Sequence, residues 1–172
     1  MHRPIVLITL LGIAIGLAMG LLDSLFHFIG YEDYKVINII IFILFFMGIY
    51  KSVAMVRDKL LSGFISYGHS VKSTIYVGII ASLLISSVRY LYLKHIANTN
   101  IEQILDNTEK HMLDHYSYYP EALIENRLSF IEFSYDPLIS SILYFGYYLV
   151  IVVIFALIAS IFLRKIDRNI SL

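Results

Sequence analysis

The last apolar run of the chain decides its fold: residues 137–163 read PLISSILYFGYYLVIVVIFALIASIFL. This run holds no Asp, Glu, Lys or Arg. It is longer than the roughly 20 residues that a helix needs to cross a bilayer, at a rise of about 1.5 Å per residue. It therefore predicts a membrane-spanning helix that tilts or projects beyond the bilayer because of its length.

Three further apolar runs precede this one. The first run, residues 4–22, also holds no charged residue. The second and third reach spanning length only with Lys51 and Arg89, whose long aliphatic stems let the charge reach the interface. The chain is thus predicted to be an all-α integral membrane protein, a four-transmembrane-helix bundle forming a single domain over residues 1–172. Its predicted spans are residues 4–26, 36–56, 74–93 and 137–163.

Composition supports a membrane protein. Of the 172 residues, 59% are hydrophobic and 15% are charged, whereas soluble domains are about half apolar and about a quarter charged. The balance of 13 Lys and Arg against 13 Asp and Glu argues against a nucleic-acid partner. The absence of Cys excludes disulfides, thiolate metal sites and a Cys nucleophile.

Orientation follows from the basic residues of the short loops. With both termini cytoplasmic, the inner side holds eight of them and the outer side four, and the outer side is also rich in Asp and Glu. The inner eight are Arg3, Lys51, Arg57, Lys59, Lys72, Arg164, Lys165 and Arg168, and the outer four are Lys35, Lys94, Lys110 and Arg127. We therefore expect a multi-pass membrane protein with both termini on the cytoplasmic side.

A signal peptide is an alternative interpretation of the N-terminus, with Ala18 and Gly20 as the small residues before cleavage. The apolar run continues through Leu21, Leu22 and Leu25, which favours an uncleaved span.

The outer loop, residues 94–136, is the one sizeable polar segment. Residues 99–102 form a capping-box pattern ahead of a helix with an apolar face, and Pro120 ends that helix. A second amphipathic piece, residues 122–133, leads to Asp136 and Pro137, a predicted N-cap followed by a first-turn proline. The loop is thus expected to form an outer amphipathic helical segment between spans 3 and 4.

Small residues recur every four positions in three spans, a spacing that lets helices approach closely in lipid. We predict that the small-residue face of span one either packs against another span of the same chain or forms the contact of an oligomer. The predicted helix-packing residues are Gly12, Gly16 and Gly20 in span one, Gly78, Ser82 and Ser86 in span three, and Ala156 and Ser160 in span four.

Two charges fall at apparent membrane depth, Asp23 and Arg89. Each lies near the outer end of its span, so the two side chains are a possible intramembrane ion pair. The alternatives are two residues that reach the surface separately, or a functional site.

His111 and His115 are one helical turn apart beside Asp114, a spacing that can bind zinc. The glutamate base of the zinc-protease pattern is missing and no third ligand is assured. A solvated helix side is the expected interpretation, and no metal or cofactor is predicted.

The inner loop between spans two and three reads RDKLLSGFISYGHSVKS, residues 57–73. It lacks the lysine of a phosphate-binding loop, and no Ser stands near a base and an orienting acid. A tight turn is expected, with Gly63 and Gly68 free to adopt positive φ.

This loop resembles the signature of a bacterial family of four-span membrane proteins of unknown function, domain of unknown function 4199. The matching residues are Arg57-Asp58-Lys59, Gly63-Phe64-Ile65-Ser66-Tyr67-Gly68, Lys72, Gly78 and Ala81-Ser82-Leu83, with the ending Ala159 to Lys165. Ser62, His69 and Ser70 depart from the family pattern. The resemblance implies the fold, membrane location and bacterial origin, but no activity.

The predicted function is a non-enzymatic accessory or scaffold subunit of a membrane assembly. Its expected partners are membrane lipids and another membrane protein or a second copy of itself. The alternative is a small oligomeric transporter or lipid flippase, with a cavity lined by Asp23, His27 and Arg89 and by Tyr144, Tyr147 and Tyr148. A hydrolase using the outer histidines ranks last.

Overall fold

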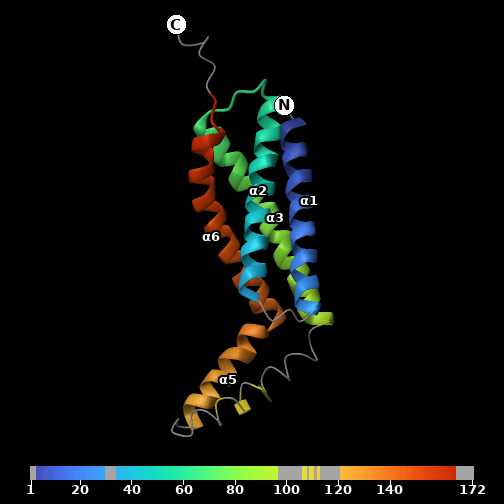
Figure 1. Cartoon of the computed structure of the whole chain (residues 1–172), viewed down its shortest axis with the longest axis vertical. Coiled ribbons are helices and arrows are strands. Elements are labelled where there is room, and N and C mark those ends of the chain that lie inside the picture. The colour runs from blue at the N-terminus through green and yellow to red at the C-terminus, as the bar shows by residue number, and fades with distance from the viewer. Residues whose placement is uncertain are drawn as a thin grey trace. The chain divides into compact units, whose positions relative to one another are not determined.

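The computed structural model describes residues 3–29, 34–96, 106–107, 109–110, 112 and 121–165. In these ranges the elements are α-helices, which confirms the predicted all-α class. They are α1 (Arg3–Ile29), α2 (Tyr34–Leu60), α3 (Tyr67–His95), α5 (Glu121–Tyr135) and α6 (Pro137–Leu163) (Figure 1).

Four of these helices are long and apolar enough to cross a membrane. Their apolar segments are Ile5–Phe26, Asn38–Leu60, Tyr67–His95 and Pro137–Leu163, which confirms the four expected spanning helices. Helices α2 and α3 extend four and seven residues further into the connecting loop than the predicted bounds of 56 and 74. The reason is that backbone hydrogen bonding, which ends a helix, continues beyond the apolar stretch that the hydropathy pattern detects.

The chain forms two compact units. The first, Met1–Val88 with Phe145–Leu172, contains α1, α2, most of α3 and most of α6. The second, Arg89–Tyr144, contains the end of α3, α5 and the start of α6.

Contacts in the first unit connect the four helices in the order α1, α2, α6, α3. Helix α1 meets α2 where Ile15 lies against Gly48, and it meets α3 along a row of glycines. Helix α2 stacks aromatic rings on α6, with Phe46 and Phe155 centroids 4.5 Å apart. Helix α6 returns to α3, where Val152 packs against Gly78. The first unit is therefore a four-helix bundle.

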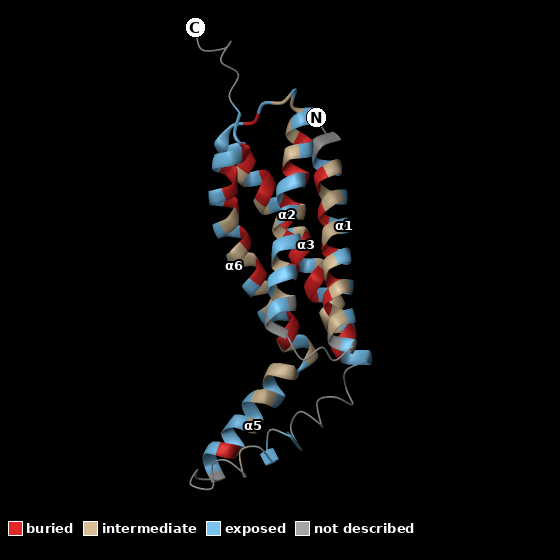
Figure 2. Cartoon of the chain, in the orientation of Figure 1, coloured by how far each residue is buried: buried red, intermediate tan, exposed pale blue. Residues whose placement is uncertain are grey.

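The inward faces of this bundle are buried and mainly apolar, whereas its outer faces are mainly apolar and exposed (Figure 2). Aliphatic and aromatic side chains such as Phe162, Leu21 and Ile161 remain more than half exposed. An exposed apolar surface of this extent suits lipid rather than water as the solvent. The buried core side chains include Phe45, Ile49, Val53, Val77, Ala81, Ile85, Tyr148, Val152 and Ala156.

The first turn of α1 and the last turn of α6 lie at the same end of the bundle, together with the α2–α3 loop (Figure 1). The side chains at this end are mainly basic. They include Lys51, Arg57, Lys59, Lys72, Arg164 and Lys165 against Asp58.

In the second unit, α5 runs into α6 through a single residue, Asp136. Its carboxylate Oδ1 accepts hydrogen bonds from the backbone N–H groups of Leu138 and Ile139, both at 2.9 Å. Pro137 occupies the first helical position, where its missing N–H costs no hydrogen bond. The predicted N-cap of span four is thus confirmed.

Candidate functional site

The inner loop and the end of α6 form a defined structure, here called the loop–α6 junction and made of Arg57, Asp58, Ile65, Leu163 and Lys165. Helix α2 ends where the carbonyl of Arg57 accepts hydrogen bonds from the N–H groups of Leu61 (3.2 Å) and Gly63 (2.9 Å). The chain reverses through Ser62 at φ 55° and Gly63 at φ 86°. This left-handed pair redirects the backbone toward α6.

Arg57 connects the loop to α6. Its Nη1 donates to the carbonyl of Leu163, the last residue of α6, at 3.0 Å. Its Nε and Nη2 bind the two oxygens of Asp58 at 2.7 and 3.0 Å. The guanidinium side chain is only 12% exposed, so a positive charge is held at the negative end of the α6 dipole, and Asp58 fixes its orientation.

A short backbone ladder completes the junction. The N–H of Ile65 donates to the carbonyl of Lys165 at 2.9 Å, and the N–H of Lys165 donates back at 3.0 Å. Nearby, the hydroxyl of Tyr67 donates to the carbonyl of Leu157 at 3.2 Å. Because each contact satisfies a backbone group or a helix terminus, the arrangement holds α2, α3 and α6 together.

Gly68 and Lys59, two residues of the predicted inner-loop motif, do not take part in the junction. Gly68 is in the first turn of α3, and its φ is not positive. The expectation of a second left-handed glycine is therefore wrong, since helix α3 begins at Tyr67. Lys59 is exposed in the last turn of α2.

The three glycines of α1 lie against α3 of the same chain. A Cβ added at Gly16 would lie 2.7 Å from the carbonyl oxygen of Ala81. At Gly12 it would lie 3.1 Å from Ile80, and at Gly20 2.9 Å from Val88. The two helix backbones approach so closely that only glycine fits at the centre of this row.

The small residues of α3 face α6 rather than α1. Gly78 packs directly on Val152, and Ser82 and Ser86 follow at four-residue spacing on the same helix face. Both hydroxyls donate to backbone carbonyls of their own helix, those of Gly78 and Leu83.

The small-residue face of α3 also extends toward the loop–α6 junction, and this extension was not among the predictions from the sequence. Ser70 and Thr74 continue the four-residue spacing and are fully buried. On α6, the predicted small residues Ala156 and Ser160 are fully buried as well. The signal that could have found the extension was the unbroken spacing of small residues from position 70 to position 86.

Asp23 and Arg89 belong to different units. Asp23 is buried in α1 with 4% of its surface exposed. Arg89 lies over the ring of Tyr144, with the guanidinium carbon 4.4 Å from the centroid, and its Nε donates to Ser140 at 3.2 Å. A cation over an aromatic face is favourable where water is excluded. The pairing of Asp23 with Arg89 stays a prediction.

The tyrosines proposed to line a transport cavity have different environments. Tyr148 is buried and packs on Phe45 with ring centroids 5.0 Å apart. Tyr147 is exposed on the outer side of α6. Tyr144 belongs to the second unit, where it contacts Arg89. The side chain of His27 lies outside the described residues.

His111 and His115, the metal candidates, also lie outside the described residues, as does the predicted capping box at residues 99–102. In the same loop, Asp106 forms an ion pair with Lys110 at 2.7 Å. This hydrogen bond raises the pKa of Lys110.

Comparison with known proteins gives one match. The family described as "Protein of unknown function (DUF4199)" matches residues 6–165. No curated protein and no solved structure matches the chain significantly. Since the match covers nearly the whole chain, including all four apolar helices and the loop–α6 junction, the protein belongs to the DUF4199 family.

Proposed function

We propose that this protein is a non-enzymatic accessory or scaffold subunit of a bacterial inner-membrane assembly, with both termini cytoplasmic. One observation carries the proposal: the centre of the bundle is filled with apolar side chains. Phe45, Val53, Val77, Val152 and Ala156 have no measurable exposure. A filled apolar core suits a rigid element that presents its outer surface to partners.

Three buried hydroxyls of the bundle support the same role. The hydroxyls of Ser52, Thr74 and Ser82 each donate to the carbonyl four residues earlier in their own helix. Hydroxyls bonded in this way have used their donor within the helix, where the bond adjusts helix packing. In the inner-loop motif, Arg57 likewise donates a hydrogen bond to the C-terminus of α6.

The glycines favour one outer face of the bundle for a partner. The Gly12–Gly16–Gly20 row is covered by α3, which supports another face for that contact. Gly146 on α6 has no atom within 4 Å of an added Cβ, and its neighbours Val150 and Val153 are exposed. Such an opening between large side chains lets a second transmembrane helix approach closely.

The test is site-specific photocrosslinking in the native membrane, followed by mild-detergent purification and mass spectrometry. A photoreactive residue at exposed Val150 should trap a reproducible membrane protein or a second copy, whereas one at buried Val152 should trap only its own chain. A purified monomer with no crosslink from Val150 or from exposed Ile158 contradicts the proposal.

Buried Asp23 favours a second candidate, a small oligomeric transporter or lipid flippase, because ionisable groups within spans often mark transport paths. The two candidates differ in flux. Reconstituted vesicles should show no Asp23-dependent movement of ions or labelled lipid if the protein is a scaffold, and movement that Asp23→Asn abolishes if it is a transporter.

A further inference from the structure

A groove lies on the outer surface of the bundle, between α2 and α6. It has a volume of about 540 Å³ and is lined by Ile43, Phe46, Met47, Tyr50, Lys51 and Phe155. The contacting rings of Phe46 and Phe155, with centroids 4.5 Å apart, connect the two helices along it. Apart from Tyr50 and Lys51, each lining residue is apolar.

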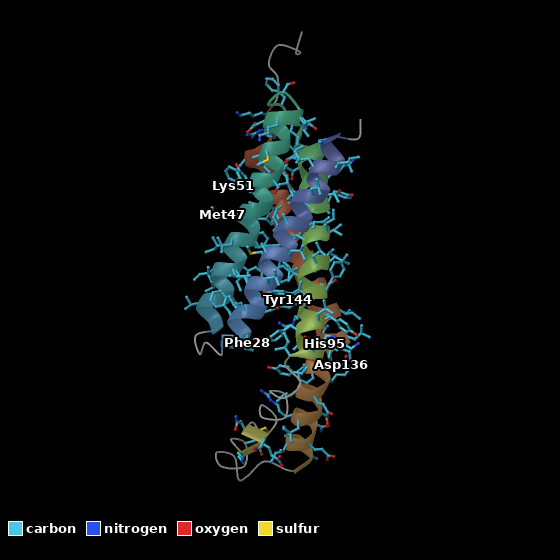
Figure 3. The ribbon with its side chains drawn as sticks, turned by 90° about the vertical axis from the view of Figure 1, so that its right-hand side faces the viewer. Phe28, Met47, Lys51, His95, Asp136 and Tyr144 are labelled. Carbon is cyan, nitrogen blue, oxygen red and sulfur yellow. The ribbon has the colours of Figure 1, made fainter. Side chains whose placement is uncertain are left out.

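The groove is apolar along its length, and Lys51 is the one charged residue among the described residues that line it. Ile43, Met47 and Lys51 follow one another at four-residue spacing on α2, so they form a single stripe about 12 Å long. Met47 and Lys51 lie on the outer side of the helix (Figure 3). Tyr50 and Lys51 line the groove with apolar atoms, and the Lys51 side chain is exposed. An amphipathic ligand in the groove thus meets an apolar wall, with the charge of Lys51 beyond its end.

The charge around this end favours an anion. Lys51, Lys59 and Lys72 are exposed there, together with Arg164 and Lys165. Among the residues that the structure describes at this end, the acidic side chain is that of Asp58, and it is held by Arg57. Basic residues at a membrane surface attract anionic lipid headgroups.

We propose that this groove is a binding site for an anionic phospholipid of the surrounding bilayer. One acyl chain lies along Ile43, Met47 and Phe155, and the lipid phosphate contacts the ammonium of Lys51. A transmembrane helix fits less well, because it would enclose the Lys51 charge in an apolar interface without a partner. The inference does not depend on the proposed scaffold function.

The test titrates the purified full-length protein with phosphatidylglycerol or phosphatidylcholine of identical acyl chains, and counts bound lipids by native mass spectrometry. The wild-type protein should bind phosphatidylglycerol more tightly. Lys51→Gln should weaken phosphatidylglycerol binding about fivefold, the contribution of one basic residue at such a surface, and leave phosphatidylcholine binding unchanged. Met47→Trp, which fills the groove, should weaken the binding of both lipids.

Lys59→Gln is the matched control, because Lys59 is an exposed lysine on the same helix but outside the groove. Its loss of phosphatidylglycerol binding should be smaller than that of Lys51→Gln, because Lys59 adds only to the surrounding basic charge and does not line the groove. Equal affinity of the wild-type protein for the two lipids would overturn the inference, and so would equal losses in Lys51→Gln and Lys59→Gln, which would show a diffuse basic surface. A protein subunit that copurifies and is released by Met47→Trp would also overturn it, because the groove would then hold a helix.

Discussion

Arg57 combines two functions that are usually separate at a helix end. Its bidentate contact with Asp58 immobilises the guanidinium, and the remaining Nη1 then serves as the C-terminal cap of α6. Lysine offers a single point charge without the planar fork, so it cannot bind both partners in this geometry. The capped carbonyl, that of Leu163, lies 106 residues away from Arg57 in the sequence.

We expect Arg57→Gln to destabilise the bundle by about 1.5 to 3 kcal/mol, the usual worth of a hydrogen bond to a charged group. Arg57→Lys should lose part of this stability. The measurement is SDS-induced unfolding in mild-detergent micelles, followed by circular dichroism. Lys59→Gln, at an exposed site two residues away, should stay within about 0.5 kcal/mol of wild type. Equal unfolding midpoints for Arg57→Gln and Lys59→Gln would refute the capping role.

The backbone reversal at Ser62 and Gly63 leads to a second prediction. Gly63→Ala should cost about 1 kcal/mol or more, because a residue with a Cβ is strained at φ 86°. Gly68→Ala is the control: its Cβ would meet no atom within 4 Å, and alanine favours a helix over glycine. Thermal unfolding of both variants should therefore show a loss for the first and no loss for the second. A loss confined to Gly68→Ala would contradict the assigned turn.

Residue roles were only partly predictable from the sequence. The positive φ of Gly63 and the N-cap Asp136 follow from local rules, and the structure confirms both. The role of Arg57 does not follow from local rules, because its partner is a backbone carbonyl in the last span. Any residue can supply a carbonyl, so the sequence contains no signal for this contact.

At the scale of elements, the α3–α6 interface depends on register. The antiparallel register that pairs Ile65 with Lys165 also sets Gly78 opposite Val152. Ser70 and Ser160 fall opposite each other in the same register, and both are fully buried. Small residues on one helix thus meet either large or small residues on the other, and this complementarity holds the helices together in lipid.

A double-mutant cycle tests this interface. Gly78→Ala should destabilise by about 1 to 3 kcal/mol, because the new methyl group overlaps the side chain of Val152. Adding Val152→Ala should recover part of that loss, since the space is then free. The readout is again SDS-induced unfolding. Strictly additive effects would contradict direct contact.

Gly146→Ala provides the matched control for this cycle. It changes a glycine of α6 with open space around its Cβ, so stability should be unchanged or slightly raised.

The existence of each spanning helix was predictable from hydropathy, because a run of about 20 apolar residues has few alternatives to a helix in lipid. Which helices contact one another was harder to predict. Glycine spacing indicated close packing of span one, but it could not specify the partner face. The structure sets the α1 glycines against Val77, Ile80 and Val88, whereas the small-residue face of α3 is turned toward α6.

At the scale of the whole molecule, one end of the bundle is basic and carries the α2–α3 loop, the junction and the Lys51 end of the groove. This end is expected to face the cytoplasm, since basic loop residues stay on the inner side. The outer loop, residues 94–136, is rich in Asp and Glu, and we predict that it faces the outside. The roles proposed for α6 and for the groove both assume this orientation.

Cysteine accessibility measures the orientation directly, because the chain contains no Cys and a single introduced thiol is unambiguous. Lys59→Cys and Glu125→Cys place thiols at exposed positions of the inner loop and of α5, and the parent protein is the unlabelled control. We predict that a membrane-impermeant maleimide labels Glu125→Cys in cells with an intact inner membrane, and labels Lys59→Cys only after that membrane is opened. Labelling of Lys59→Cys from outside, with Glu125→Cys protected, would contradict the orientation. Labelling of both from one side would contradict the four-span architecture itself.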